Sequence, residues 1–222
     1  MTDTATLRFD PRLWQLISPA SPTGAFHFSQ GLEQAIDNGT ISSAQTASDW
    51  LAGLLRHGVA RVDVPLLVRT HRAAETQNVD ALRRWDELTH ACRETRELRN
   101  EEVTMGLTFT QLCRSLAIDL PAGSYGYTCA FGWAAHSIGV GEEDMLGGYL
   151  WAWLENQTLV ATKLIPLGHL EGQQVLARLS KMIEVAVNVG RGLKDDEIGM
   201  SLPGWIHASV AHESQYSRVF RS

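Results

Sequence analysis

The sequence contains few cysteines, and they are arranged unlike those of a disulfide scaffold or a thiolate metal site. Cys92, Cys113 and Cys129 are the three cysteines among 222 residues, and no two of them form a CxxC pair. An odd number of widely spaced cysteines argues against a disulfide framework and against a cysteine-ligated metal. We therefore interpret them as buried, reduced thiols and expect a cytoplasmic protein.

The sequence also lacks an apolar run long enough to cross a bilayer, which takes about 20 consecutive apolar residues. The most apolar stretch, residues 149–154, is closely flanked by acidic residues at 142–144 and 155 and by Lys163. Residues 1–10 contain no basic segment followed by an apolar one, so we see no signal peptide and expect a flexible N-terminus.

Positive charge is in the minority. Lys and Arg number 19 against 25 Asp and Glu, which gives a net charge of −6, and no dense basic block is present. Such a chain is poorly suited to binding nucleic-acid backbones or anionic membrane surfaces. We predict that its partners include neither nucleic acid nor membrane.

The motifs of common catalytic sites are missing. There is no GxxxxGK[ST] phosphate loop, no GxSxG nucleophile turn and no HExxH zinc pair, and residues 190–194 have the wrong spacing for a phosphate loop. We therefore predict a protein that is not an enzyme, has no catalytic residues and works by holding other proteins. A metal-dependent enzyme built from scattered His, Asp and Glu residues is a minor alternative.

Helical periodicity, by contrast, runs through nearly the whole chain. The clearest stripe has the i, i+3, i+4, i+7 spacing of one buried helix face over more than four turns. Pro65 should end this helix, because proline lacks an amide donor and clashes with the preceding turn. The stripe consists of Ala47, Trp50, Leu51, Leu54, Leu55, Gly58, Val59 and Val62.

Similar patterns predict further helices at 66–74, 125–138, 143–164 and from about 170 to 190. The 125–138 segment is rich in Gly and Ala, and small residues let helices approach closely, so we place it centrally. No convincing strand, internal repeat or long linker is present. The sequence thus predicts an all-α fold, a single-domain helical bundle over residues 1–222 with roughly eight to ten helices.

Charged residues of both signs dominate the segment 93–102. Their i, i+3 and i, i+4 spacings allow ion pairs along one side of a helix. This pattern predicts a solvated helix face. The residues concerned are Glu94, Arg96, Glu97, Arg99, Glu101 and Glu102.

The C-terminal stretch, residues 203–222, is short and polar, so we expect it to be loosely held in the isolated protein. Its two histidine rings would point about 140° apart on a helix with 3.6 residues per turn. His207, His212 and Glu213 are weak metal candidates that could share an ion only in a loop or with ligands from a partner. The simpler interpretation is a polar surface, and we expect no tightly bound cofactor.

Four segments, taken together and in this order, resemble the UreF family of urease accessory proteins. The resemblance extends over about residues 12–222, and its first and last segments are long and unusual enough to be specific. The four segments are residues 16–26 with 28–33 (LISPASPTGAF and FSQGLE), 50–58 with 63–67, 93–97 with 105–106, and 163–168 with 212–222 (KLIPLG and HESQYSRVFRS).

The resemblance implies an all-α protein that forms a homodimer and joins two other accessory proteins, UreD (also called UreH) and the GTPase UreG. That assembly loads nickel into apo-urease, so nickel is handled by the complex. The missing phosphate loop fits this role, because the GTPase is a different chain. In such proteins the C-terminal tail is expected to become ordered on binding UreD.

The resemblance transfers positions of partner contact, not of catalysis. Glu33 and Asp63 lie near helix breaks, where side chains are well placed to meet a partner, although an ordinary solvated carboxylate is the alternative for each. Aromatic and arginine side chains in the tail can bury large areas or donate several hydrogen bonds. The predicted partner-binding residues are Glu33, Asp63, Lys163, Tyr216, Arg218, Phe220 and Arg221.

Two functions of different classes remain open. The first is a urease maturation chaperone that scaffolds UreD/UreH and UreG for GTP-dependent nickel insertion into apo-urease. The second is a regulator of GTP hydrolysis on UreG, in which a cation inserted in trans stabilises charge on the transferring phosphoryl group. Lys163, Arg218 and Arg221 are the candidate cations, and UreG turnover measured with and without the protein discriminates the two functions.

Overall fold

The computed structural model describes residues 10–222, which are helical with no strand, and this confirms the predicted all-α class. The expected flexible N-terminus falls almost wholly on residues 1–9, outside the described part of the chain. Eleven α-helices lie within the described part, one more than the upper end of the expectation. They are α1 (Pro11–Ile17), α2 (Leu32–Asp37), α3 (Ala44–Leu54), α4 (Asp63–Glu75), α5 (Val79–Cys92), α6 (Arg96–Ser115), α7 (Tyr127–Ser137), α8 (Glu142–Leu164), α9 (His169–Ser180), α10 (Ile183–Gly192) and α11 (Pro203–His212).

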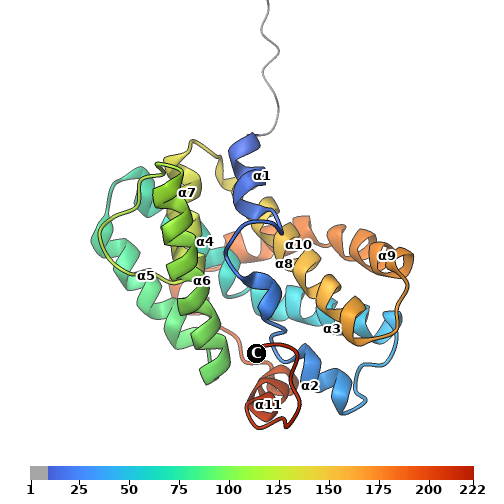
Figure 1. Cartoon of the computed structure of the whole chain (residues 1–222). Helices are drawn as coiled ribbons and strands as arrows, with labels where there is room; N and C mark the ends of the chain where they lie inside the picture. Colours follow the sequence, from blue (N-terminus) through green and yellow to red (C-terminus); the bar gives the residue numbers. More distant parts are fainter. Residues whose placement is uncertain (1–9) are drawn as a thin grey trace, which may run out of the picture.

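Helix α7 lies at the centre of one half of the molecule, packed against α4, α5, α6 and α8 (Figure 1). Its residues 128–135 are all buried. A Cβ atom on Gly132 would lie 2.1 Å from Thr70 Oγ1, so the glycine is what lets α7 approach α4. The central position predicted for the small-residue helix is therefore confirmed.

The apolar stripe 47–62 is buried as expected, but the helix that carries it ends differently. After α3 the chain forms a π-helical turn, η2 (Leu55–Val59), and α4 then begins at Asp63. Pro65 does not end a helix, because it lies in the first turn of α4. Amide groups in a first turn have no partner within the helix, so the missing N–H of proline costs little there.

The helix predicted from about 170 to 190 is broken in two at Lys181 and Met182. The break redirects the chain, so that α9 packs against α3 and α8 while α10 packs against α4 and α8. A Cβ atom on Gly190 would lie 2.5 Å from Ala60 O, which shows how closely α10 approaches the turn before α4. Tertiary packing therefore overrides a continuous helical pattern that has no Pro or Gly at the break.

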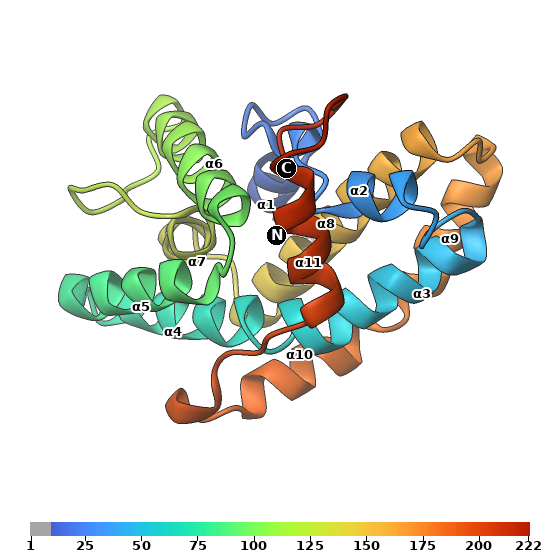
Figure 2. The same cartoon turned by 90° about the horizontal axis from the view of Figure 1, so that it is seen from below.

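The C-terminal stretch is packed onto the body of the protein, contrary to the loose tail that its polarity predicts. Figure 2 shows α11 lying between α6 and α2, and it packs against both. Ala208 and Phe220 join a second apolar cluster with Leu32, Val160 and Ile165. These two apolar side chains anchor the segment together with its hydrogen bonds and ion pairs.

None of the helices within residues 10–222 is both long and apolar enough to cross a bilayer.

Candidate functional site

The buried carboxylate of Glu33 holds the end of the C-terminal tail. Glu33 lies in the first turn of α2 and its side chain is 5% exposed. Its two oxygens accept hydrogen bonds from the backbone amides of Val219, at 2.7 Å, and Phe220, at 2.9 Å. One of these oxygens also lies 3.0 Å from His212 Nε2. Glu33 therefore faces this chain's own tail in the structure.

His212 lies between two carboxylates and is fully buried. Its Nε2 faces Glu33, and its Nδ1 lies 2.8 Å from Glu97 Oε2 on α6. Glu97 also accepts a hydrogen bond of 3.1 Å from Arg218 Nη1. We call Glu33, Glu97, His212 and Arg218 the tail-docking cluster.

The weak metal candidates do not come together. His207 is exposed, whereas both ring nitrogens of His212 are engaged by carboxylates, and Glu213 pairs instead with Arg96 at 2.9 Å. Within residues 10–222 no group of three His, Cys, Asp or Glu residues is arranged to hold a metal ion. The helical geometry of α11 separates the two rings, as the 140° argument requires.

The last residues of the tail are fixed to the loop before α2. The backbone oxygen of Ser222 accepts hydrogen bonds from the amide and the hydroxyl of Ser29, and the Arg221 amide donates to His27 O at 2.7 Å. Phe220 is buried, and Lys163 Nζ lies 5.8 Å from the centre of its ring.

The tail nevertheless presents several side chains outwards. Tyr216 and Val219 are fully or largely exposed, Arg221 is exposed, and the Arg218 side chain is 41% exposed. The structure thus brings Glu33, Lys163 and the four predicted tail residues together in one region. It leaves Asp63 out of that region.

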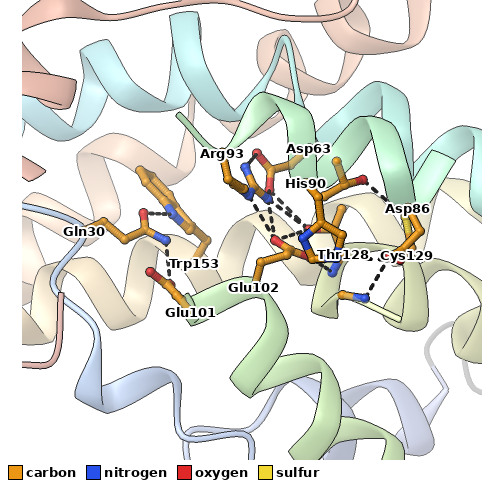
Figure 3. A network of polar contacts seen from close by, with 12 residues as sticks. Gln30, Asp63, Asp86, His90, Arg93, Glu101, Glu102, Thr128, Cys129 and Trp153 are labelled. Atoms are coloured by element: carbon orange, nitrogen blue, oxygen red, sulfur yellow. Dashed lines mark hydrogen bonds and ion pairs between the residues drawn. The ribbon is translucent and has the colours of Figure 1, made fainter. Parts of the chain in front are cut away.

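Asp63 belongs to a buried ion-pair cluster between α4, α6, α7 and α8 (Figure 3). Arg93 Nη2 lies 2.7 Å from both Asp63 Oδ1 and Glu102 Oε2. Tyr149 Oη donates to Asp63 Oδ1 at 3.0 Å, and the Thr128 hydroxyl completes the cluster. We call these five residues the central ion-pair cluster.

Burial and charge act in opposite directions on Arg93. Burial by itself lowers the pKa of the guanidinium, but the charges of Asp63 and Glu102 outweigh it and hold that pKa well above its usual value. Burial, reinforced by the same two carboxylates, raises the pKa of Tyr149. The tyrosine therefore stays protonated and donates its hydrogen bond. The cluster fixes Asp63 in the interior, where it holds helices together.

Gln30 and Glu101 form a separate set of hydrogen bonds beside the central ion-pair cluster. Gln30 Nε2 donates to Glu101 Oε1 at 2.8 Å, and Gln30 Oε1 accepts from Trp153 Nε1 at 3.0 Å (Figure 3). Trp205, at the start of α11, donates to the backbone oxygen of Gln30 at 2.7 Å. Ser222 Oγ donates to Glu101 Oε2 at 3.3 Å. Burial raises the pKa of Glu101 to about 7 despite these hydrogen bonds.

A small cavity of about 80 Å³ lies beside Glu101. Asp63, Arg93 and Glu102 of the central ion-pair cluster line it, together with Gln30 and Trp205. Trp205 of α11 forms part of the cavity wall, so a shift of α11 would change the shape of the cavity.

The charged groups of both clusters are paired within this chain. They hold the helices and the tail in position and accept hydrogen bonds from backbone amides. Each buried carboxylate accepts from an arginine, a histidine, an amide or a hydroxyl. Such pairing satisfies the strong requirement that buried charges be neutralised and hydrogen-bonded.

Comparison with known proteins places the chain in a family. The UreF family model matches residues 41–180. The urease accessory protein UreF of Chromohalobacter salexigens is 44% identical over 95% of this chain and 93% of its own length. The corresponding protein of Alkalilimnicola ehrlichii is 41% identical over 95% of both chains. The chain belongs to the UreF family.

In this member of the UreF family, the resemblance first observed in four short motifs therefore extends over nearly the whole chain. Two of those motifs meet in space, because the FSQGLE segment supplies Ser29 and Glu33, and the HESQYSRVFRS segment supplies their partners. The motifs pair with one another in the folded chain, although nearly 180 residues separate them.

Sequence reasoning missed the buried residues of the 93–102 segment. This segment is expected to form a solvated face, but Arg93, Glu97, Glu101 and Glu102 are all buried, while Glu94, Arg96 and Arg99 are exposed. Glu97 and Glu101 are spaced i, i+4, which places two like charges on one helix face. This spacing indicates that the two carboxylates have partners on elements other than their own helix.

Proposed function

We propose that the chain is a urease maturation chaperone that scaffolds UreD (UreH) and the GTPase UreG while nickel passes into apo-urease. Membership of the UreF family supports a role in urease maturation, since the relatives are named urease accessory proteins. The named partners and the nickel cargo rest on the resemblance. In this proposal the chain performs no catalysis, binds no cofactor tightly, and acts as a homodimer in the cytoplasm.

The observation that carries the proposal is the two-sided tail. Residues 213–222 turn Phe220 inwards and present Tyr216, Val219 and Arg221 outwards. Aromatic and arginine side chains held on a fixed backbone lose less conformational freedom when a partner binds. We assign this outward surface of the tail to the contact with UreD.

The test is co-purification with UreD. Tyr216→Ala and Arg221→Ala should each weaken capture of UreD, and the double variant should abolish it, while the helical content of the chain is unchanged. Arg114→Ala, an exposed arginine near the end of α6, is the matched control and should retain full capture. Normal UreD binding by the double variant would contradict the assignment of the tail.

A second function, regulation of GTP hydrolysis on UreG, is favoured by the gathering of cations around the tail. Lys163 lies against Phe220, and Arg218 and Arg221 flank the same residue in sequence. A cation supplied in trans accelerates phosphoryl transfer by roughly 10³–10⁵. UreG turnover that rises with this chain and collapses with Lys163→Ala or Arg221→Ala supports this function, whereas unchanged turnover supports scaffolding alone.

A further inference from the structure

We propose that Glu33 and Glu97 hold the tail through one proton that they share with His212, so that docking of residues 213–222 weakens as pH rises. The contacts that dock the tail all lie within this chain. The consequence of docking for UreD rests on the proposed function, in which the docked tail presents the UreD contact.

The argument begins with the number of protons that the tail-docking cluster needs. His212 Nδ1 lies 2.8 Å from Glu97 Oε2, and Nε2 lies 3.0 Å from Glu33 Oε2. An ionised carboxylate can only accept hydrogen bonds, and a neutral imidazole carries one N–H. With all three groups in their proton-poor forms, one ring nitrogen would face a carboxylate lone pair to lone pair.

Two arrangements satisfy both contacts. In the first, a doubly protonated imidazole donates to two carboxylates. In the second, a neutral imidazole donates to one carboxylate and accepts from the carboxylic acid of the other. Both hold the same total, one proton more than the proton-poor cluster. The requirement therefore does not depend on which atom carries the proton.

Burial of the His212 ring is what makes this proton necessary, because the neighbouring donors by themselves favour ionised carboxylates. Arg218 balances part of the charge on Glu97 at 3.1 Å, and the backbone amides of Val219 and Phe220 donate to Glu33. Arg96 and Glu213 pair with each other at 2.9 Å on the outer side of α11. The ring of His212 is fully buried, so water cannot replace a lost contact.

Undocking exposes the ring to water, where an imidazole gives up its second proton near pH 6.5. Above that pH, docking must take up one proton. By linkage, the equilibrium constant for docking then falls by up to tenfold for each further unit of pH.

The experiment is NMR of the full chain between pH 6 and 9, with His212 identified by comparison with a His212→Gln variant. The expected result at low pH is a docked tail, seen as shifted amide signals of Val219 and Phe220, with one proton in each of the two hydrogen bonds of His212. The docked population should decline above pH 6.5. A docked population that stays constant from pH 6.5 to 9 would overturn the proposal, as would a docked His212 that carries one ring proton between two ionised carboxylates.

Conservative variants separate a shared proton from simple packing. In Glu97→Gln the amide nitrogen can donate to Nδ1 while the amide oxygen still accepts from Arg218, so docking no longer needs the extra proton. The decline above pH 6.5 should disappear in this variant, and docking at pH 8.5 should exceed that of the wild type. His207→Gln, an exposed histidine on the same helix, is the control and should retain the full pH dependence.

A separate measurement distinguishes this inference from the proposed function. Capture of UreD by the wild type should be weaker at pH 8.5 than at pH 6.5, and Glu97→Gln should remove much of that difference. If tail docking depends on pH but UreD capture does not, the shared proton stands and the assignment of the tail to UreD fails. If neither depends on pH, the shared proton itself is wrong.

Discussion

Arg93 Nη2 lies 2.7 Å from Asp63 Oδ1, and this contact ties the turn after α5 to the first turn of α4. Removing one partner of a buried ion pair leaves the other charge uncompensated, which costs about 3–5 kcal/mol. We expect Arg93→Met to lower the free energy of unfolding by that amount, as measured by urea denaturation.

The control for this variant is Arg83→Met. Arg83 pairs with Asp80 at 3.3 Å on the exposed side of α5, and surface pairs of this kind contribute less than about 1 kcal/mol. Equal losses in the two variants would show that the buried cluster does not stabilise the fold.

Local patterns predicted the helices because the information for them is local. The stripe from Ala47 to Val62 and the small residues of α7 each indicate which face is buried, and the structure buries those faces. The helix end predicted at Pro65 is wrong. Proline is excluded from a helix interior but accepted in a first turn, and the sequence alone does not say in which of these it lies.

The candidate site was harder to predict because its partners lie far apart along the chain. Asp63 pairs with Arg93, and Glu33 pairs with His212, only because the chain folds. No short-range spacing in the sequence indicates these pairs. A charged residue looks the same in sequence whether it faces water or a buried partner. The motifs are therefore visible in the sequence, whereas the contacts that Asp63 and Glu33 make within the chain are not.

Glu101 makes stability depend on pH. Burial raises its pKa from 4.5 to about 7 in the folded protein, so the folded form binds more protons between these values. The contribution of this proton to stability is complete below pH 4.5 and is lost as pH rises to 7. The free energy of unfolding falls by roughly 3 kcal/mol over this range. Glu101→Gln should remove that slope in urea denaturation measured from pH 4.5 to 8.

The matched control is Glu75→Gln, an exposed glutamate at the end of α4. It should show the same pH dependence as the wild type. If Glu101→Gln shows that dependence too, the titrating group lies elsewhere.

Gly132 sets the distance between α4 and α7. A methyl group there would lie 2.1 Å from Thr70 Oγ1 and 3.2 Å from Leu67 O. Overpacking of a buried contact costs about 1–3 kcal/mol, so we expect Gly132→Ala to lower the unfolding free energy by that amount, with partial recovery in the Thr70→Ala double variant.

Gly147 on α8 provides the contrast, because a Cβ atom added there meets nothing within 4 Å. Gly147→Ala should stabilise the protein by roughly 0.5–1 kcal/mol, since alanine loses less backbone entropy in a helix. Chemical denaturation measures both variants. Destabilisation of similar size in both would mean that loss of glycine, and not the α4–α7 contact, is responsible.

Phe220 and Tyr216 lie four residues apart in the tail and face opposite environments, the first 6% exposed and the second fully exposed. Truncation of a buried phenylalanine costs about 3–5 kcal/mol in a core, but here the loss is limited by the free energy of releasing the tail alone. Phe220→Ala should therefore free the tail, seen as faster hydrogen exchange at the Val219 amide, while α4 and α7 keep their protection.

Tyr216→Ala should leave that exchange unchanged and yet reduce capture of UreD. If Tyr216→Ala released the tail as readily as Phe220→Ala, the distinction between the residue that docks the tail and the residue that it presents would be lost.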